Sequence, residues 1–205
     1  MQPRHALFLK AIAFAADKHR HQRRKDPEAS PYINHPIELA NVLVHEGRVT
    51  DTTVLIAAIL HDTLEDTETT PDELAAAFGG EIRDIVIEVT DNKMLKKHKR
   101  KELQVKHGPH LTRKARLVKL ADKICNLRDV ATNPPARWPL KRQIEYFDWA
   151  KSVIDSMRGT HPRLEALFDA VYARRPHARR WLRHAKPAVR GPHVRRAARV
   201  FSPAR

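Results

Sequence analysis

Residues 54–66 read VLIAAILHDTLED, seven apolar residues that run without a break into His61 and Asp62. So long an apolar run favours a helix buried on all sides at the centre of a bundle. Glu65 and Asp66 follow the His-Asp pair by four residues, so on a helix they lie one turn further along the same side. A bound divalent cation would remove the cost of burying these charges. Taken alone, however, a His-Asp pair is more typical of a surface residue beside a helix cap.

Composition limits the class of protein. The chain has 205 residues, of which 41% are hydrophobic, so one sizeable core is expected. No apolar run reaches the roughly 18–20 residues of a membrane span, and the first residues lack the apolar region of a signal peptide. Cys125 is the only cysteine, which excludes an internal disulfide framework and a metal site built from thiolates. We therefore expect a cytoplasmic protein with no membrane partner.

The net charge of +15 is concentrated at the C-terminal end. Residues 174–205 hold 11 of the 39 Lys and Arg and no acid, which leaves 28 − 24 = +4 for residues 1–173. Four prolines also interrupt this segment. We therefore predict a folded domain over residues 1–175 and a basic, disordered tail over residues 176–205, with weak nucleic-acid association confined to the tail. The mildly basic domain suits a small anionic molecule.

The domain is predicted to be all-α. Thr70 and Glu73 form a capping-box pattern with Pro71 at the first helical position, and Gly79-Gly80 end that helix. No pair of runs alternates in the manner of a β-hairpin, so we expect a compact bundle of roughly eight or nine helices. The later helices are expected at about 82–89, 94–106, 112–131, 138–158 and 161–174.

Two further segments add residues that could bind a metal. PYINHPIELA (31–40) supplies His35, and LVKLADKICNLRDV (117–130) supplies Asp122. With His61 and Asp62 they give two neutral imidazoles and two carboxylates, whose charge of −2 balances a divalent ion. Nitrogen and oxygen donors without sulfur suit Mn, Fe, Co or Zn. Considered without the other residues, His35 is more typical of a helix cap and Asp122 is more typical of a salt bridge.

The order His, His-Asp, Asp on an all-helical chain resembles the metal signature of the HD superfamily. The segments HQRRKD, PYINHP, AAILHDTLEDT, FGGEIRDIVIEVTDNK and KLADKICNLRD resemble the hydrolase domain of the RelA/SpoT alarmone enzymes. The likeness is greatest to the small stand-alone alarmone hydrolases, which include the metazoan SpoT homologue, and it runs from about residue 5 to residue 173. It implies an HD-domain fold and a Mn-dependent enzyme that removes the 3′-pyrophosphate of ppGpp or pppGpp, giving GDP or GTP and pyrophosphate.

The resemblance also implies roles for the metal-binding and acidic residues. One divalent ion per active site, Mn²⁺ or another divalent metal, is expected on four ligands. The acidic pair that follows is expected to orient the attacking water and to move its proton. The ligands are His35, His61, Asp62 and Asp122, and the catalytic pair is Glu65 and Asp66.

Substrate contacts are expected from three segments. Arg24 and Lys25 match the Arg-Lys step that lies beside the nucleotide in the family. Asn126 and Arg128 match its N-x-R segment; Asn126 is one turn beyond Asp122, whereas Arg128 could instead be structural. The basic run KMLKKHKRK supplies Lys97 as a phosphate contact, with a solvated helix face as the alternative reading.

Three classes of function follow from these residues. The first is the alarmone hydrolase, and the second is a metal-dependent phosphatase on another nucleotide, such as NADPH at its 2′-phosphate. The third is a basic nucleic-acid-binding protein, which has no need of intact metal ligands and an acidic pair. Tyr146 and Trp149, at helical spacing, are expected in the core rather than against a base, and Cys125 is expected to be a packing residue. The oligomeric state is left open.

Overall fold

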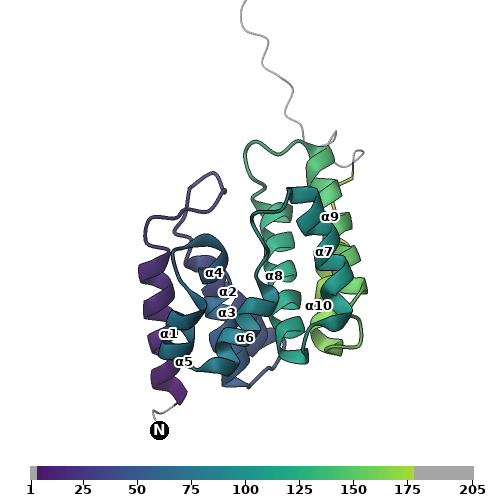
Figure 1. Cartoon of the computed structure of the whole chain (residues 1–205). Helices are drawn as coiled ribbons and strands as arrows, with labels where there is room; N and C mark the ends of the chain where they lie inside the picture. Colours follow the sequence, from purple (N-terminus) through teal and green to yellow (C-terminus); the bar gives the residue numbers. More distant parts are fainter. Residues whose placement is uncertain (1–3, 178–205) are drawn as a thin grey trace, which may run out of the picture.

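A computed structural model of the chain describes residues 4–177 (Figure 1). Over this range there are ten α-helices and no β-strand, so the all-α prediction is confirmed. Nine of these helices have eight or more residues, and α4 is a single turn. The predicted tail lies almost entirely outside the described residues. The helices are α1 (Arg4–Lys18), α2 (Asn34–Asn41), α3 (Thr52–Leu60), α4 (Thr63–Asp66), α5 (Pro71–Phe78), α6 (Gly80–Val89), α7 (Lys97–His107), α8 (Arg113–Thr132), α9 (Leu140–Asp155) and α10 (Pro162–Tyr172), with a π-helix at Val42–Glu46 and a 3-10 turn at Gly108–His110.

Helix α3 is the centre of the fold, as its apolar sequence predicts. Residues 56–60 are all buried, and the helix packs against α1, α2, α6 and α8. The Asp51 side chain caps its first turn by accepting a hydrogen bond from the Thr53 N–H at 2.9 Å. In Figure 1, α1–α6 lie on one side of α8, and α7, α9 and α10 lie on the other. Helix α8 therefore joins the two groups of helices and contributes side chains to both.

Helix boundaries follow the capping signals of the sequence. The Thr70 hydroxyl accepts from the Glu73 N–H at 3.2 Å, Pro71 begins α5, and Gly79 ends it with φ of 91°. The Glu73 carboxylate does not complete the capping box; it forms an ion pair with Lys18 of α1 at 2.7 Å. The five later helices begin and end within three residues of their predicted limits. Within residues 4–177, no helix is both long and apolar enough to span a membrane.

Candidate metal centre and substrate pocket

Three parts of the fold bring the four predicted metal ligands together. His61 and Asp62 lie in the turn between α3 and α4, His35 lies in the first turn of α2, and Asp122 lies in the middle of α8. His61 Nε2 is 3.0 Å from Asp62 Oδ2 and 3.9 Å from Asp122 Oδ1, and His35 Nε2 is 3.3 Å from Asp122 Oδ1. One ligand atom from each of His35, His61 and Asp62 falls within 4.8 Å of the others.

The helical geometry expected for the stretch 57–66 needs a correction. Helix α3 ends at Leu60, and the His-Asp pair forms a turn before the short α4 instead of continuing one helix. The Thr63 hydroxyl donates to the Leu60 carbonyl at 2.6 Å and so satisfies one of the acceptors that this break exposes. The break matters because it directs both the imidazole and the carboxylate of the pair toward His35.

The hydrogen bonding of His61 fits a metal ligand. Its Nδ1 lies 2.8 Å from the Ala58 carbonyl oxygen and donates to it, which leaves the Nε2 lone pair free. Nε2 is buried and makes no hydrogen bond, although Asp62 lies close to it. Burial lowers the pKa of His61, but Asp62 and Asp122 outweigh it and raise the pKa to about 9. The carboxylates that favour a proton here also favour a divalent cation, so the donor set fits such an ion.

The carboxylate ligands are themselves held by neighbours. The Tyr32 hydroxyl donates to Asp62 Oδ2. Lys123 Nζ donates to Asp122 Oδ2 at 2.7 Å, and Asn126 Nδ2 donates to Asp122 Oδ1 at 2.5 Å. Such contacts fix the orientation of a ligand. Tyr32 and Lys123 were not predicted to have a role, although Tyr32 belongs to the PYINHP motif and Lys123 is the residue next to Asp122.

The two acids after the His-Asp pair point to different surroundings. Asp66 lines a pocket of about 770 Å³ and forms an ion pair with Lys93. Glu65 Oε2 accepts from the Asp91 N–H at 3.2 Å, and Glu65 Oε1 lies 3.7 Å from Arg100 Nη1 on α7. Burial, together with Asp62, Asp91 and Asp66, raises the pKa of Glu65 to about 6. The pair is therefore split, with one acid facing the pocket and the other facing α7.

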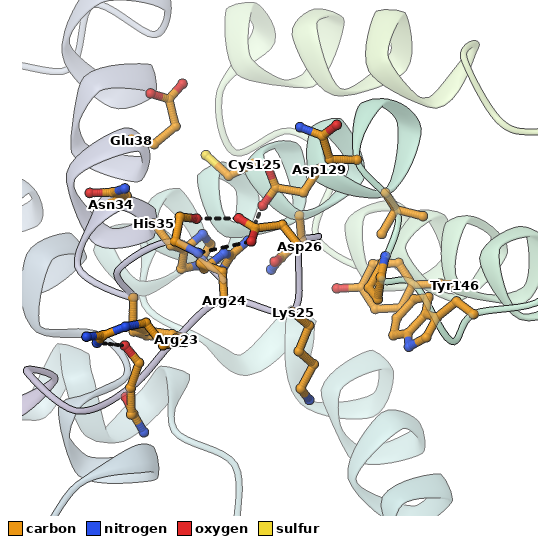
Figure 2. A pocket seen from close by; sticks show the side chains of 18 of the residues that line it. Arg23, Arg24, Lys25, Asp26, Asn34, His35, Glu38, Cys125, Asp129 and Tyr146 are labelled. Atoms are coloured by element: carbon orange, nitrogen blue, oxygen red, sulfur yellow. Dashed lines mark hydrogen bonds and ion pairs between the residues drawn. The ribbon is translucent and has the colours of Figure 1, made fainter. Parts of the chain in front are cut away.

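A pocket of about 770 Å³ opens beside His35 (Figure 2). Its walls come from the segment after α1, from α2, from the second half of α8 and from α9, with Lys97 contributed by α7. Five cationic side chains reach it, three from the segment after α1 and one each from α7 and α9, against four acids. The cations are Arg23, Arg24, Lys25, Lys97 and Arg142, and the acids are Asp26, Glu38, Asp66 and Asp129.

Four of the five predicted substrate-contact residues line this pocket, namely Arg24, Lys25, Lys97 and Asn126. Arg24 forms an ion pair with Asp129 across the pocket, and burial with nearby Arg142 and Lys25 lowers the pKa of Lys97. Arg128 is not among the lining residues.

Arg128 instead holds two helical segments together. It donates two hydrogen bonds to the Glu46 carboxylate, at 2.6 and 2.7 Å. Glu46 closes the π-helix and Arg128 belongs to α8, so this bidentate pair corresponds to the structural alternative considered for Arg128.

The pocket also includes residues that sequence analysis did not place there. Tyr146, expected in the core, is packed on one side and forms the pocket wall on the other, next to Trp138 at 5.3 Å between ring centroids. Arg142 stacks on Trp138 with 4.3 Å between its guanidinium carbon and the ring centroid. Cys125 is buried yet also lines the pocket. Helical spacing gives the same signal for a core face and for a pocket wall, so the sequence did not separate them.

Comparison with known proteins places the chain in a family. The family model described as "HD domain" matches residues 11–146, which is more than half of the chain. The chain belongs to the HD-domain family. Membership of this family implies divalent metal binding, and His35, His61 and Asp62 form the cluster of potential ligands in this HD domain.

Relatives of this HD-domain chain are similar over nearly their full length. The protein of Xenopus tropicalis called guanosine-3′,5′-bis(diphosphate) 3′-pyrophosphohydrolase MESH1 is 54% identical over 167 residues, 82% of this chain and 93% of that protein. Its Homo sapiens counterpart is 52% identical over 170 residues, 83% of this chain and 95% of that protein. A solved structure titled "A metazoan ortholog of SpoT hydrolyzes ppGpp and plays a role in starvation responses" superposes with a TM-score of 0.81 at 43% identity, covering 85% of this chain and 98% of that one.

Proposed function

We propose that this HD-domain protein is a guanosine-3′,5′-bis(diphosphate) 3′-pyrophosphohydrolase. It hydrolyses ppGpp or pppGpp to GDP or GTP and releases pyrophosphate. Relatives that carry this activity in their names are about half identical to the chain over most of its length. The observation that carries the proposal is the pocket of about 770 Å³, with five cationic side chains in its walls, that opens directly beside His35 of the metal-ligand cluster. A phosphorylated nucleotide fits both the volume and the charge of this pocket.

We propose one Mn²⁺ per active site, held by His35, His61, Asp62 and Asp122. The orphaned Nε2 of His61 and the close approach of Asp122 to both imidazoles support this ligand set. The ion would polarise a phosphoryl oxygen and lower the pKa of its bound water. Nitrogen and carboxylate donors also accept other divalent metals, so the choice of manganese rests on the family resemblance.

Cationic side chains of the pocket are proposed to bind the phosphates. Arg24 and Lys25 come from the segment after α1, and Lys97 comes from α7. The burial of Lys97 among other cations lowers its pKa, which favours an anionic ligand. Asn126 reaches the pocket while donating to Asp122, so it can contact substrate and metal ligand together. Arg24 also lies against the Tyr32 ring, 5.8 Å from its centroid, which keeps the guanidinium plane in place.

Glu65 and Asp66 are proposed to handle the proton of the attacking water. A general base works best when its pKa lies near the working pH, and Glu65 meets this condition with a pKa of about 6. Asp66 lines the pocket, and its ion pair with Lys93 holds the carboxylate in place there. We further propose that the enzyme works in the cytoplasm, in keeping with a nucleotide substrate.

A substrate panel tests the function. The full-length protein is incubated with Mn²⁺ and ppGpp, pppGpp, NADPH, GTP or ATP, and products are separated by ion-exchange chromatography. We expect GDP and pyrophosphate from ppGpp, with His61→Ala as the inactive control. Orthophosphate released from NADPH, with no pyrophosphate from either alarmone, would reject the proposal in favour of the 2′-phosphatase alternative.

A further inference from the structure

His19 is a buried histidine that belongs neither to the metal-ligand cluster nor to the wall of the substrate pocket. It directly follows α1, and only 2% of its surface is exposed. The charged groups that act on its ring are nevertheless those of the metal centre, namely Asp62, Asp66 and His61. Phenylalanine would fill the same space without burying a polar atom, so packing alone does not account for an imidazole here.

One ring nitrogen of His19 binds Gln22. Burial lowers the pKa of His19, although Gln22 and nearby acids oppose this, so the ring is neutral at pH 7 and carries one N–H. Nδ1 is in hydrogen-bond contact with Gln22 Oε1, and because an amide oxygen only accepts, Nδ1 is the nitrogen that donates. Nε2 is buried and makes no hydrogen bond to any of residues 4–177. Within this range, His19 therefore has a single hydrogen-bonded partner for its ring.

Gln22 extends this contact to the helix that carries Asp66. Its Nε2 donates to the Asp66 carbonyl oxygen at 2.8 Å. Asp66 is the last residue of α4, where a carbonyl has no acceptor role left to play within the helix. A helix of one turn is not stable by itself, so the position of α4 depends on tertiary contacts of this kind. The hydrogen bonds from His19 to Gln22 and from Gln22 to Asp66 thus fix the end of α4.

The ring of His19 also contacts Tyr32. The two ring centroids are 4.8 Å apart, and the ring planes are inclined by 36°. Tyr32 in turn donates from its hydroxyl to Asp62 Oδ2, a contact that orients this proposed metal ligand. One imidazole therefore touches both the residue that holds Asp62 and the residue that holds Asp66.

We propose that His19 is a positioning residue for the metal centre, which orients Asp62 through Tyr32 and fixes Asp66 through Gln22. The inference rests on the proposed function, in which Asp62 binds the metal and Asp66 handles a proton. The two contacts depend on different properties of the ring. Contact with Tyr32 requires a flat ring, whereas contact with Gln22 requires the N–H at Nδ1. Substitutions at His19 can therefore separate the two effects.

The test compares His19→Phe with His19→Leu in the full-length protein. Phenylalanine keeps a ring beside Tyr32 but loses the hydrogen bond to Gln22, and leucine loses both. The dissociation constant for Mn²⁺ is measured from the EPR signal of the free ion, and kcat and KM for ppGpp are measured at saturating Mn²⁺. We expect His19→Phe to keep its Mn²⁺ affinity with kcat about tenfold lower, and His19→Leu to lose about tenfold in both. KM should not change in either variant, because His19 does not line the pocket.

A double-mutant cycle tests the contact through Gln22. Gln22→Met removes both hydrogen bonds of the amide, and we expect it to lower kcat by about tenfold as well. Because Gln22 also lines the pocket, the comparison is made on kcat. The protein with both His19→Phe and Gln22→Met should be no slower than either single variant, since both substitutions interrupt the same chain of contacts. Losses that add in the double variant would overturn the proposal.

The matched control is His21→Phe, because His21 is exposed two residues further on and hydrogen-bonds to its neighbour Arg20. Its Mn²⁺ affinity and kcat should equal those of the wild type. Melting temperatures distinguish the proposal from a packing role. His19→Phe removes a buried nitrogen without a partner, so it should melt no lower than the wild type while its kcat falls.

A wild-type kcat in His19→Phe would overturn the proposal, as would wild-type Mn²⁺ affinity in folded His19→Leu. If His19→Leu does not fold, His19→Phe and the cycle with Gln22→Met still decide the outcome. Absence of ppGpp hydrolysis by the wild-type protein would instead overturn the proposed function, and the Mn²⁺ affinities would still test the contact through Tyr32.

Discussion

The imidazole ring of His61 has both features of a metal ligand, a fixed tautomer and an unpaired nitrogen. Its Nδ1 is bound to the Ala58 carbonyl, which fixes the tautomer, and its Nε2 lies between two carboxylates without a hydrogen bond of its own. Removing this ring takes away one nitrogen ligand, so the remaining side chains bind a divalent cation more weakly. The same reasoning applies to Asp122, whose loss would also reduce the negative charge of the site.

We expect His61→Ala and Asp122→Ala to lose bound metal and activity together. Metal content is measured by atomic emission after dialysis against a limiting concentration of Mn²⁺, alongside ppGpp hydrolysis. His110→Ala is the matched control, because His110 is exposed on the 3-10 turn and lies outside the ligand cluster. Full metal content in both ligand variants would reject the assignment.

Glu65 gives the reaction a predictable dependence on pH. Because its pKa is raised to about 6, the ionised form needed for a base is populated only as the pH rises through that value. We expect kcat to increase across this range in the wild type. Glu65→Gln should lower kcat by roughly 10²–10⁴-fold and flatten the profile. A profile unchanged by the substitution would show that another group titrates.

The same pKa shift predicts an effect on stability. A carboxyl group whose folded pKa lies above its unfolded value of about 4.5 stabilises the fold at low pH, and this contribution is lost as the pH rises through about 6. We therefore expect Glu65→Gln to become more stable relative to the wild type between pH 5 and pH 8. Urea denaturation of chelator-treated protein measures the difference. A constant difference across that range would contradict the shift.

Arg24 has a planar guanidinium placed between the Tyr32 ring and Asp129. Lysine keeps the charge but loses the planar guanidinium that contacts both Tyr32 and Asp129. We expect Arg24→Lys to raise KM for ppGpp while leaving the metal content unchanged. Arg20→Lys is the control, because Arg20 is exposed and pairs with Asp17 outside the pocket. Unchanged steady-state kinetics in Arg24→Lys would show that Arg24 does not contact the substrate.

At the scale of the elements, Arg128 joins α8 to the π-helix at Val42–Glu46. The two side chains are partly exposed, at 26% for Arg128 and 35% for Glu46, so solvent screens the pair. We expect Arg128→Met to cost about 1 kcal/mol or less of unfolding free energy. KM for ppGpp should not change, because Arg128 does not line the pocket. A large rise in KM with intact stability would restore Arg128 as a substrate contact.

Helix α7 has the sequence of a solvent-exposed helix, yet several of its residues line cavities. Its sequence, KHKRKELQVKH, has no buried residue and would suit a solvated surface helix. In the fold, Lys97 lines the substrate pocket, while Arg100 and Gln104 line a second cavity of about 160 Å³. The polar composition of α7 is therefore explained by two cavities as well as by solvent.

At the scale of the whole molecule, the buried core found among residues 4–177 extends from residue 11 to residue 171. Arg175 still contacts the body by two hydrogen bonds of 2.6 Å to Asp148. We expect a protein truncated after His177 to keep its melting temperature and its ppGpp hydrolysis. Any association of the full chain with RNA should disappear, and it should fall steeply with salt while present. A large loss of melting temperature or activity would assign residues 178–205 to the fold.

The sequence by itself predicted the helical class, the limits of the later helices and the four residues proposed as metal ligands. These depend on local patterns: the apolar run of α3, the Thr70 cap, and the His, His-Asp, Asp order that marks the family. The apolar run and the cap are signals set by neighbours a few residues away, so they need no tertiary information. The four ligands lie far apart in the sequence, and their order was interpretable only through the family resemblance.

Only the tertiary structure decided where side chains with the same local signal point. Tyr146 and Trp149 share a helical spacing, yet Tyr146 forms part of the pocket wall and Trp149 does not. Arg128 and Asn126 share a motif, but only Asn126 reaches the pocket. The position of Lys123 depends on how α8 packs against α9, where its ammonium lies over the Trp149 ring. The direction in which a side chain faces depends on contacts between distant segments, and periodicity along one helix does not specify those contacts.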